Sequence, residues 1–381
     1  MISKVLIYIN LMVRFIKFFC DFAFMIEIDG NYLEGGGQII RNSLALSALT
    51  GKAFKITDIR KGRQNPGLQA QHLSCVNAVK ELCSADVENA FIGSEELTFI
   101  PRKIKAKDIS IDVGTAGSLT LVLQSLLLPC FFAGKKINIE LTGGTDVSWS
   151  MPVDYFKNVY VPHILRFCKS FEMFVPKRGY YPKGSGKIEI HLKPKYDINE
   201  FSSFDEFIKK LREEKPIEIF EREKLMIIKG ISHASMDLES AKVAERQNNA
   251  AKNVLKDYQA DIRSEYNNAL STGSGITLWA IYGEENKKIV FGADALGAKG
   301  KSAELVGQEA AKKLIDIIKS DACVDENLED NMIPWLALFS GKIKVHKMTN
   351  HTLTNIYTTE QFLGKCFEVD MENKTIEVKN N

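Results

Sequence analysis

The sequence predicts an α+β fold in which three repeated units pack together and one small α+β domain is inserted among them. One order of features occurs three times along the chain: an apolar helix, a Gly-Lys turn, a short alternating strand, a polar loop and a second helix. The Gly-Lys turns begin at residues 51, 134 and 341, so the second interval is more than twice the first. We interpret most of that excess as the inserted domain.

Local patterns define the elements of each unit. A glycine follows each first helix, where a left-handed C-cap is expected, and the strands KITDI, KINIEL and KIKVHK alternate in polarity. No unit has enough apolar surface to fold alone, so the three are expected to share a core. The apolar runs that predict the first helices are residues 39–50, 119–133 and 328–340.

The inserted domain shows its own strand and helix patterns. Residues 225–233 are predicted as a strand, 238–258 as an amphipathic helix, and 276–283 with 287–293 as a hairpin. The charged stretch 209–218 before them is interpreted as a solvated helix and linker. We therefore predict an N-terminal extension at 1–24, a large domain formed by 25–195 and 291–381, and an inserted domain at 196–290.

Composition limits the class of protein. A chain of 381 residues with 45% hydrophobic and 26% charged residues is typical of a globular protein with two or three domains. The net charge of +2 disfavours a protein that coats nucleic acid, although it is compatible with one that grips a single strand end. The seven cysteines lack CxxC spacing, which suits a reducing cytoplasm and indicates neither a zinc site nor a disulfide framework.

Residues 1–24 are apolar but interrupted. Asn10, Arg14, Lys17 and Asp21 break the run, so neither a spanning helix nor a signal peptide fits it. We interpret the segment as an appended extension and expect no stable membrane partner. A membrane-surface helix remains the alternative.

A glycine-rich segment, DGNYLEGGGQIIR at 29–41, lies between the strand MIEI and the first apolar helix. Glycines let backbone N–H groups approach a phosphate, and the N-terminus of a helix favours negative charge. The segment is neither a Walker A loop nor GxGxxG, and glycine-rich turns are also common without a ligand. It is therefore a candidate phosphate site.

Several motifs together carry a family resemblance. The runs EGGGQIIR, IRKGRQNPGLQAQHL, GTAGSLTLVLQ, GGTD, RGYYPKGSG and NHTLTN occur in the order found in the RNA 3'-phosphate cyclase family, which the chain resembles over residues 25–381. The resemblance implies three βαβαββ units with one inserted small domain. That architecture agrees with the repeat found in the sequence.

The resemblance also implies an activity. It is the ATP-dependent conversion of an RNA 3'-terminal phosphate to a 2',3'-cyclic phosphate, through a covalent histidine–AMP intermediate and an RNA-adenylate. The expected substrates are ATP and an RNA 3' end, the expected metal is Mg²⁺ or Mn²⁺, and the expected location is the cytoplasm. Adenylylation supplies a good leaving group, and the adjacent 2'-hydroxyl then closes the ring intramolecularly.

The resemblance assigns roles to individual residues. His351, in what we interpret as a loop after the third unit's strand, is the expected nucleophile, and Glu34 is the expected metal carboxylate. The resemblance places the expected nucleotide and phosphate ligands at Arg41, Arg63, Gln71, Gln124, Tyr155 and Asp330.

Each assignment has a plainer alternative. His351 is otherwise an exposed loop histidine, Arg41 a solvated helix residue, and Asp330 a helix-surface acid. Gln124 lies within an apolar run, where an unpaired amide would be costly, so it is either a ligand or internally paired. The sequence also departs from the family pattern, which concerns nucleotide affinity or local backbone rather than the chemistry; the departing positions are Met151, Tyr155, Ser185 and Asn327.

Three other functions fit parts of the sequence less well. A non-catalytic relative that acts in ribosome assembly would lack the histidine and the glycine pattern, both of which are present. An enolpyruvyl transferase built from similar units would need six of them. A membrane-associated binding protein would depend on residues 1–24.

Overall fold

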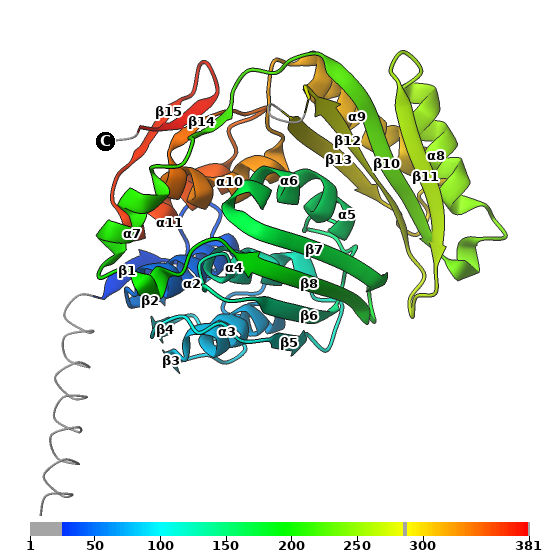
Figure 1. Ribbon diagram of the computed structural model, residues 1–381. Helices are drawn as coiled ribbons and strands as arrows, with labels where there is room; N and C mark the ends of the chain where they lie inside the picture. The colour runs from blue at the N-terminus through cyan, green and yellow to red at the C-terminus, as the bar shows by residue number, and fades with distance from the viewer. Residues whose placement is uncertain (1–24, 285–287, 380–381) are drawn as a thin grey trace, which may run out of the picture.

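The computed structural model describes residues 25–284 and 288–379, so the predicted extension at 1–24 lies outside the described residues. The described chain forms four four-stranded sheets (Figure 1). Three of these sheets share one strand order, which confirms the predicted α+β fold of repeated units.

The first unit has the strand order β1-β2-β4-β3, with β1 and β2 parallel and the remaining pairs antiparallel. Its first helix ends at Gly51, which has a φ of +72°, as the C-cap pattern predicts. The elements are β1 (Ile26–Asp29), α2 (Gln38–Thr50), β2 (Phe54–Thr57), α3 (Ala70–Cys83), β3 (Asp86–Glu88) and β4 (Leu97–Ile100).

The second unit repeats this topology with the order β5-β6-β8-β7. Its second helix is irregular, because Pro162 cannot donate a backbone hydrogen bond and a π-helical turn precedes it. The elements are β5 (Ile109–Asp112), α4 (Leu119–Cys130), β6 (Ile137–Gly143), α5 (Val153–Tyr155), η1 (Phe156–Tyr160), α6 (Val161–Ile164), η2 (Leu165–Phe167), β7 (Cys168–Lys177) and β8 (Gly186–Pro194).

The third unit begins before the insertion. Its first strand, β9, pairs in parallel with β14, although the two are separated by the whole inserted domain. Here the interpretation of 209–218 as helix and linker was incomplete, since a strand of three residues is too short to show a period. The elements are β9 (Ile217–Ile219), α10 (Glu326–Phe339), β14 (Gly341–Lys344), α11 (Asn350–Leu363), β15 (Phe367–Asp370) and β16 (Thr375–Val378), preceded by η3 (Ile198–Glu200) and α7 (Phe204–Leu211).

The inserted domain is one sheet, ordered β11-β10-β12-β13, with two helices that pack on each other and on the sheet. Figure 1 shows these helices on the side of the sheet away from the core. This unit runs from 225 to 319, later than the predicted 196–290, because β9 belongs to the third unit and α9 packs on β12 and β13. The elements are β10 (Leu225–Ser235), η4 (Met236–Leu238), α8 (Val243–Val254), β11 (Ala260–Asn267), β12 (Ser274–Tyr282), β13 (Ile289–Leu296) and α9 (Ala303–Lys319).

Helices from all three units meet in the core. Helix α2 contacts α3, α4 and α11, and α11 also contacts α10. Helix α2 is buried over most of its length, as its apolar sequence requires. Within residues 25–284 and 288–379, every helix falls short of the length and apolar character that a membrane crossing requires.

Candidate active site

A cleft of about 930 Å³ opens where these helices begin. Its lining includes the first turns of α2, α3, α4, α10 and α11, together with the glycine-rich loop before α2. The N-terminal turn of a helix presents unpaired N–H groups and a partial positive charge. Five such turns around one cavity make it a site for an anion.

His351 lies in the first turn of α11, with its side chain 46% exposed. The interpretation of this segment as a loop was wrong, because Thr349 caps the helix by accepting a hydrogen bond from the Thr352 N–H. The imidazole Nε2 lies 2.9 Å from Glu34 Oε2, and Nδ1 lies 3.8 Å from Asp330 Oδ2. Three residues far apart in the sequence thus meet in one cleft.

The electrostatics around His351 favour a neutral ring. Burial lowers the pKa of His351 from its ordinary value of 6.5, and Arg41 and Arg63 lower it further, whereas Glu34 opposes them. A neutral imidazole retains a lone pair on one nitrogen, which makes it a competent nucleophile near neutral pH.

The glycine-rich loop places Glu34 beside His351. Asn31 fixes this loop by accepting a hydrogen bond of 2.8 Å from the Gly62 N–H, which joins it to the loop that carries Arg63. The Arg63 guanidinium then lies 3.5 Å from Glu34. At Gly37 a Cβ would lie 2.5 Å from His72 Nε2 and 2.8 Å from an Arg41 nitrogen. Only glycine leaves room for both donors beside the backbone.

Arg41 is buried in the cleft and is only 8% exposed, so it is not a solvated helix residue. Its Nε donates to Gln124 Oε1 at 2.7 Å, and Gln124 donates in turn to Asn331 at 2.9 Å. The amide of Gln124 is therefore internally paired. Burial lowers the pKa of Arg41, and no carboxylate of the described residues forms an ion pair with its guanidinium to offset this effect.

Three donors in the cleft have no hydrogen-bond partner among the described residues: Gln38 Nε2, Arg60 Nε and Gln71 Nε2. Buried donors are nearly always paired in folded proteins, because an unpaired donor costs about 1–3 kcal/mol. Their concentration in one cavity indicates an acceptor-rich ligand. Phosphate oxygens satisfy donors of this kind.

Two cleft residues were missed by the sequence analysis as site residues. His72 lines the cleft, and its Nδ1 accepts a hydrogen bond of 3.0 Å from the Gln69 N–H, which leaves the proton on Nε2 facing Gly37. Burial, with Arg41 and Arg60, lowers the pKa of His72 to about 3. Arg60 lies in the run IRKGRQNPGLQAQHL but was assigned no role. No spacing rule distinguishes either residue, since they reach the cleft through packing.

Acidic groups also line the cleft, namely Asp294, Glu326 and Asp330. Burial raises the pKa of Asp330 to about 7, and it raises the pKa of Glu329, which is buried next to Asp330 outside the cleft lining, to about 8. Asp330 accepts a hydrogen bond from the Thr352 hydroxyl at 3.1 Å. It is a half-buried residue of the cleft and not a helix-surface acid.

Tyr155 is the predicted ligand that the structure does not bring to the cleft. The side chain is fully buried, and its hydroxyl donates to Asp325 Oδ1 at 2.5 Å. The neighbouring Met151 and Asn327 do line the cleft. Because α5 turns Tyr155 toward the inserted domain, its role here is in packing.

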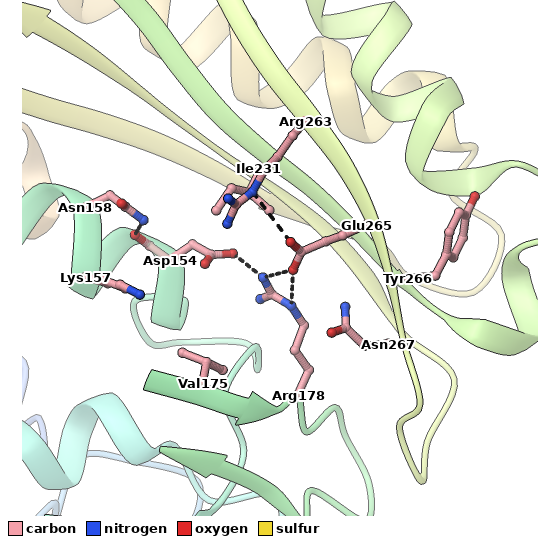
Figure 2. A pocket seen from close by; sticks show the side chains of 10 residues that line it. All are labelled: Asp154, Lys157, Asn158, Val175, Arg178, Ile231, Arg263, Glu265, Tyr266 and Asn267. Atoms are coloured by element: carbon pink, nitrogen blue, oxygen red, sulfur yellow. Dashed lines mark hydrogen bonds and ion pairs between the residues drawn. The ribbon is translucent and has the colours of Figure 1, made fainter. Parts of the chain in front are cut away.

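Among the described residues, one group of potential metal ligands lies elsewhere: Asp146, Asp154 and His233. Arg178 binds both carboxylates, at 3.1 Å and 2.6 Å, and also binds Glu265 of the inserted domain at 2.7 Å. Figure 2 shows Arg178 between Asp154 and Glu265. A guanidinium that already occupies the carboxylates leaves no room for a cation, so this group is a salt-bridge network.

The sequence is similar to a known family of proteins. Residues 32–369 match the family described as RNA 3'-terminal phosphate cyclase. Curated proteins named RNA 3'-terminal phosphate cyclase are 47% identical over 347 residues in Pyrococcus furiosus and 42% identical over 359 residues in Archaeoglobus fulgidus. The first alignment covers 91% of this chain and 95% of the relative, and the second covers 93% and 100%.

Proposed function

The chain belongs to the RNA 3'-terminal phosphate cyclase family, and from this premise we propose that it uses ATP to cyclise an RNA 3'-terminal phosphate through a covalent His351–AMP intermediate. The observation that supports the proposal most directly is the imidazole of His351, neutral and 2.9 Å from Glu34, in a cleft of unpaired donors. An alternative function as a binding protein would need neither feature.

The first step forms a bond between a nitrogen of His351 and the α-phosphorus of ATP. The bond from that phosphorus to the bridging oxygen breaks, and pyrophosphate leaves with the electron pair. The ring nitrogen without a proton is the nucleophile. Arg41, Arg63 and Gln71 are the proposed donors to the phosphate oxygens, where the planar guanidinium groups suit paired oxygens.

The next two steps transfer AMP and release it. An oxygen of the RNA 3'-phosphate attacks the phosphorus of His351–AMP, the N–P bond breaks, and the imidazole, which has kept the proton on its other nitrogen, leaves as a neutral ring. The 2'-hydroxyl then attacks the 3'-phosphorus, loses its proton, and expels AMP as the ring closes. Holding the RNA end in one geometry makes this closure effectively intramolecular.

A divalent cation fits beside Glu34. Mg²⁺ and Mn²⁺ favour oxygen ligands, and Mg²⁺ commonly takes one or two carboxylates together with substrate phosphates. Glu34 provides one carboxylate at the cleft, and Asp330 provides a second on the other side of His351. The ion would neutralise negative charge on the phosphates, while Glu34 would hold it.

A labelling experiment tests the proposed function. The protein is incubated with ATP labelled at the α-phosphate and with Mg²⁺ or Mn²⁺, and protein-bound, acid-labile AMP is measured. Addition of RNA with a 3'-phosphate should discharge the label and yield a 2',3'-cyclic end, whereas RNA with a 3'-hydroxyl should not. Absence of labelling would remove the proposal and favour the non-catalytic alternative.

We also propose a cytoplasmic location. Among the described residues six cysteines are free and none forms a disulfide, which suits a reducing compartment. Fractionation of cells that express the full chain tests this. Recovery with membranes that is lost on truncation to Met25 would instead support a role for residues 1–24.

A further inference from the structure

A second cavity, of about 760 Å³, adjoins the cleft on the side of the inserted domain. We call it the insert-side pocket; Val147, Ser148 and Tyr181 line both it and the cleft. The two cavities therefore continue into each other. A polymer whose end lies in the cleft has a path into this pocket.

Two aromatic side chains stand where the cavities meet. Trp149 is 98% exposed and Tyr181 is 76% exposed, and both line the cleft. Trp149 also has a φ of +67°, a backbone conformation that is costly for a bulky residue. The other two tryptophans of the chain, Trp279 and Trp335, are buried. Exposed aromatic faces of this kind stack on unpaired bases without regard to sequence.

The charges of the insert-side pocket suit a polyanion. Its basic lining residues are Arg246, Lys299 and Lys301, of which Arg246 pairs with Glu304 and Lys301 with Glu309. Its one acidic lining residue, Asp146, is held by Arg178. Lys299 makes no ion pair with the described part of the chain and is exposed. Lysine side chains along a groove neutralise backbone phosphates and release their counterions.

The turn 297–301 ends at the first turn of α9, and Ser302 caps that helix. Ser274 lies against the turn, because a Cβ at Gly297 would collide with its hydroxyl. Ser274 is 8% exposed and lines the pocket, and its hydroxyl has no hydrogen bond to the residues that the structure describes. A hydroxyl that opens into the pocket beside a helix N-terminus adds a donor for an anionic oxygen.

We propose that the insert-side pocket binds the nucleotides that precede the 3' end of a single-stranded RNA. The bases stack on Trp149 and Tyr181, and the phosphates lie near Lys299 and the first turn of α9. This inference rests on the proposed function, because it assigns the path of the strand whose 3'-phosphate reacts at His351.

Kinetics with the intact protein test the path. The substrate is a single-stranded RNA of about ten nucleotides with a 3'-phosphate, and the control reaction is AMP labelling with ATP alone. Trp149→Ala and Tyr181→Ala should each lower kcat/KM for this RNA by about 5- to 100-fold, the loss of one stacked base. AMP labelling should remain within about two-fold of wild type, as only the strand is affected.

Matched variants separate the path from a general effect on the surface. Phe174→Ala removes an aromatic side chain that is 48% exposed on β7 and lines neither cavity, so RNA kinetics should not change. Lys299→Ala should reduce the salt dependence of RNA binding by about 0.7 in the log–log slope, the value for one phosphate on a single strand. Lys103→Ala, outside both cavities, should leave that slope unchanged.

The outcomes are distinct. Unchanged RNA kinetics in both aromatic variants would overturn the inference and assign the pocket to another ligand. Equal losses of labelling and cyclisation would also overturn it, because the rings would then serve the nucleotide in the cleft. Absence of labelling in the wild-type protein would instead remove the proposed function itself.

Discussion

Arg41 and Arg178 are both buried, yet they lie in regions of opposite electrostatic character. Arg178 binds Asp146 and, as Figure 2 shows, Asp154 and Glu265, at the junction of the core and the inserted domain. Burial by itself would lower the pKa of Arg178, but these carboxylates outweigh it and raise the pKa well above its ordinary value. In the part of the chain that the structure describes, the guanidinium of Arg41 is bonded to the amide of Gln124 alone, and burial lowers the pKa of Arg41.

The difference separates structural charge from functional charge. The carboxylates around Arg178 complete its bonding within the protein, and the network joins β11 of the inserted domain to the segment after β7. The cleft keeps donors unpaired at a cost in stability, which a phosphate-bearing ligand would offset. A buried charge that is paired within the protein stabilises the fold, whereas a buried charge without an ionic partner is available to bind a ligand.

His351→Ala should give the largest effect on activity. Loss of the nucleophile should remove AMP labelling to below detection, because no other described group has the same position between Glu34 and Asp330. The half-exposed side chain contributes little to the core, so the free energy of unfolding should change by less than about 1 kcal/mol. Residual labelling at a substantial fraction of the wild-type level would contradict the role of His351.

Arg178→Met should give the largest effect on stability. Removal of one partner leaves buried carboxylates uncompensated, which costs about 3–5 kcal/mol in the free energy of unfolding. Chemical denaturation measures this loss. Arg102→Met is the matched control, since Arg102 and Asp86 form an exposed pair, for which about 0–1 kcal/mol is expected. Equal losses of unfolding free energy in the two variants would show that the Arg178 network contributes no more than an exposed ion pair.

Arg41→Met should weaken ATP binding more than it weakens stability, in contrast to Arg178→Met. Affinity for ATP should fall by about 10- to 100-fold, the loss of a charged hydrogen bond to phosphate. Stability should change by no more than about 1 kcal/mol, because the substitution removes a buried charge that no described carboxylate binds. Equilibrium binding of ATP and denaturation of the same sample provide both values. A loss of stability as large as that of Arg178→Met would contradict the assignment of Arg41 to ligand binding and of Arg178 to the fold.

The pH dependence should give the smallest effect near neutrality. Only neutral His351 attacks, and its pKa lies below 6.5, so the initial rate of labelling should stay near its maximum down to about pH 6.5 and fall at lower pH. A labelling rate that halves between pH 8 and 7 would contradict the lowered pKa of His351.

Burial would raise the pKa of Asp146, but His233 and Arg178 outweigh burial and lower it. The contribution of Asp146 to the free energy of unfolding is therefore present above pH 3.8 and is lost as the pH falls below that value.

The sequence predicted most of the fold but only part of the site. Repeats, glycine caps and alternating strands are encoded within a few residues, so the three units and three of the four strands of the inserted sheet were recognisable, whereas β11 was not predicted. Strand β9 was missed because three residues show no period, although its pairing with β14 defines where the third unit begins. Tyr155 lies only four residues after Met151, yet only Met151 lines the cleft, because sequence position does not report which way a side chain turns.

By itself the sequence determined the repeated units, the glycine-rich loop and the candidate roles of His351 and Glu34, because each depends on a local pattern or a motif. Tertiary structure alone decided that these two side chains meet at 2.9 Å, and that Arg60 and His72 join them. It also brought the first turns of five helices around one cavity. The physical reason is that packing between units sets these distances, and no local pattern in the chain records which helix ends will face each other.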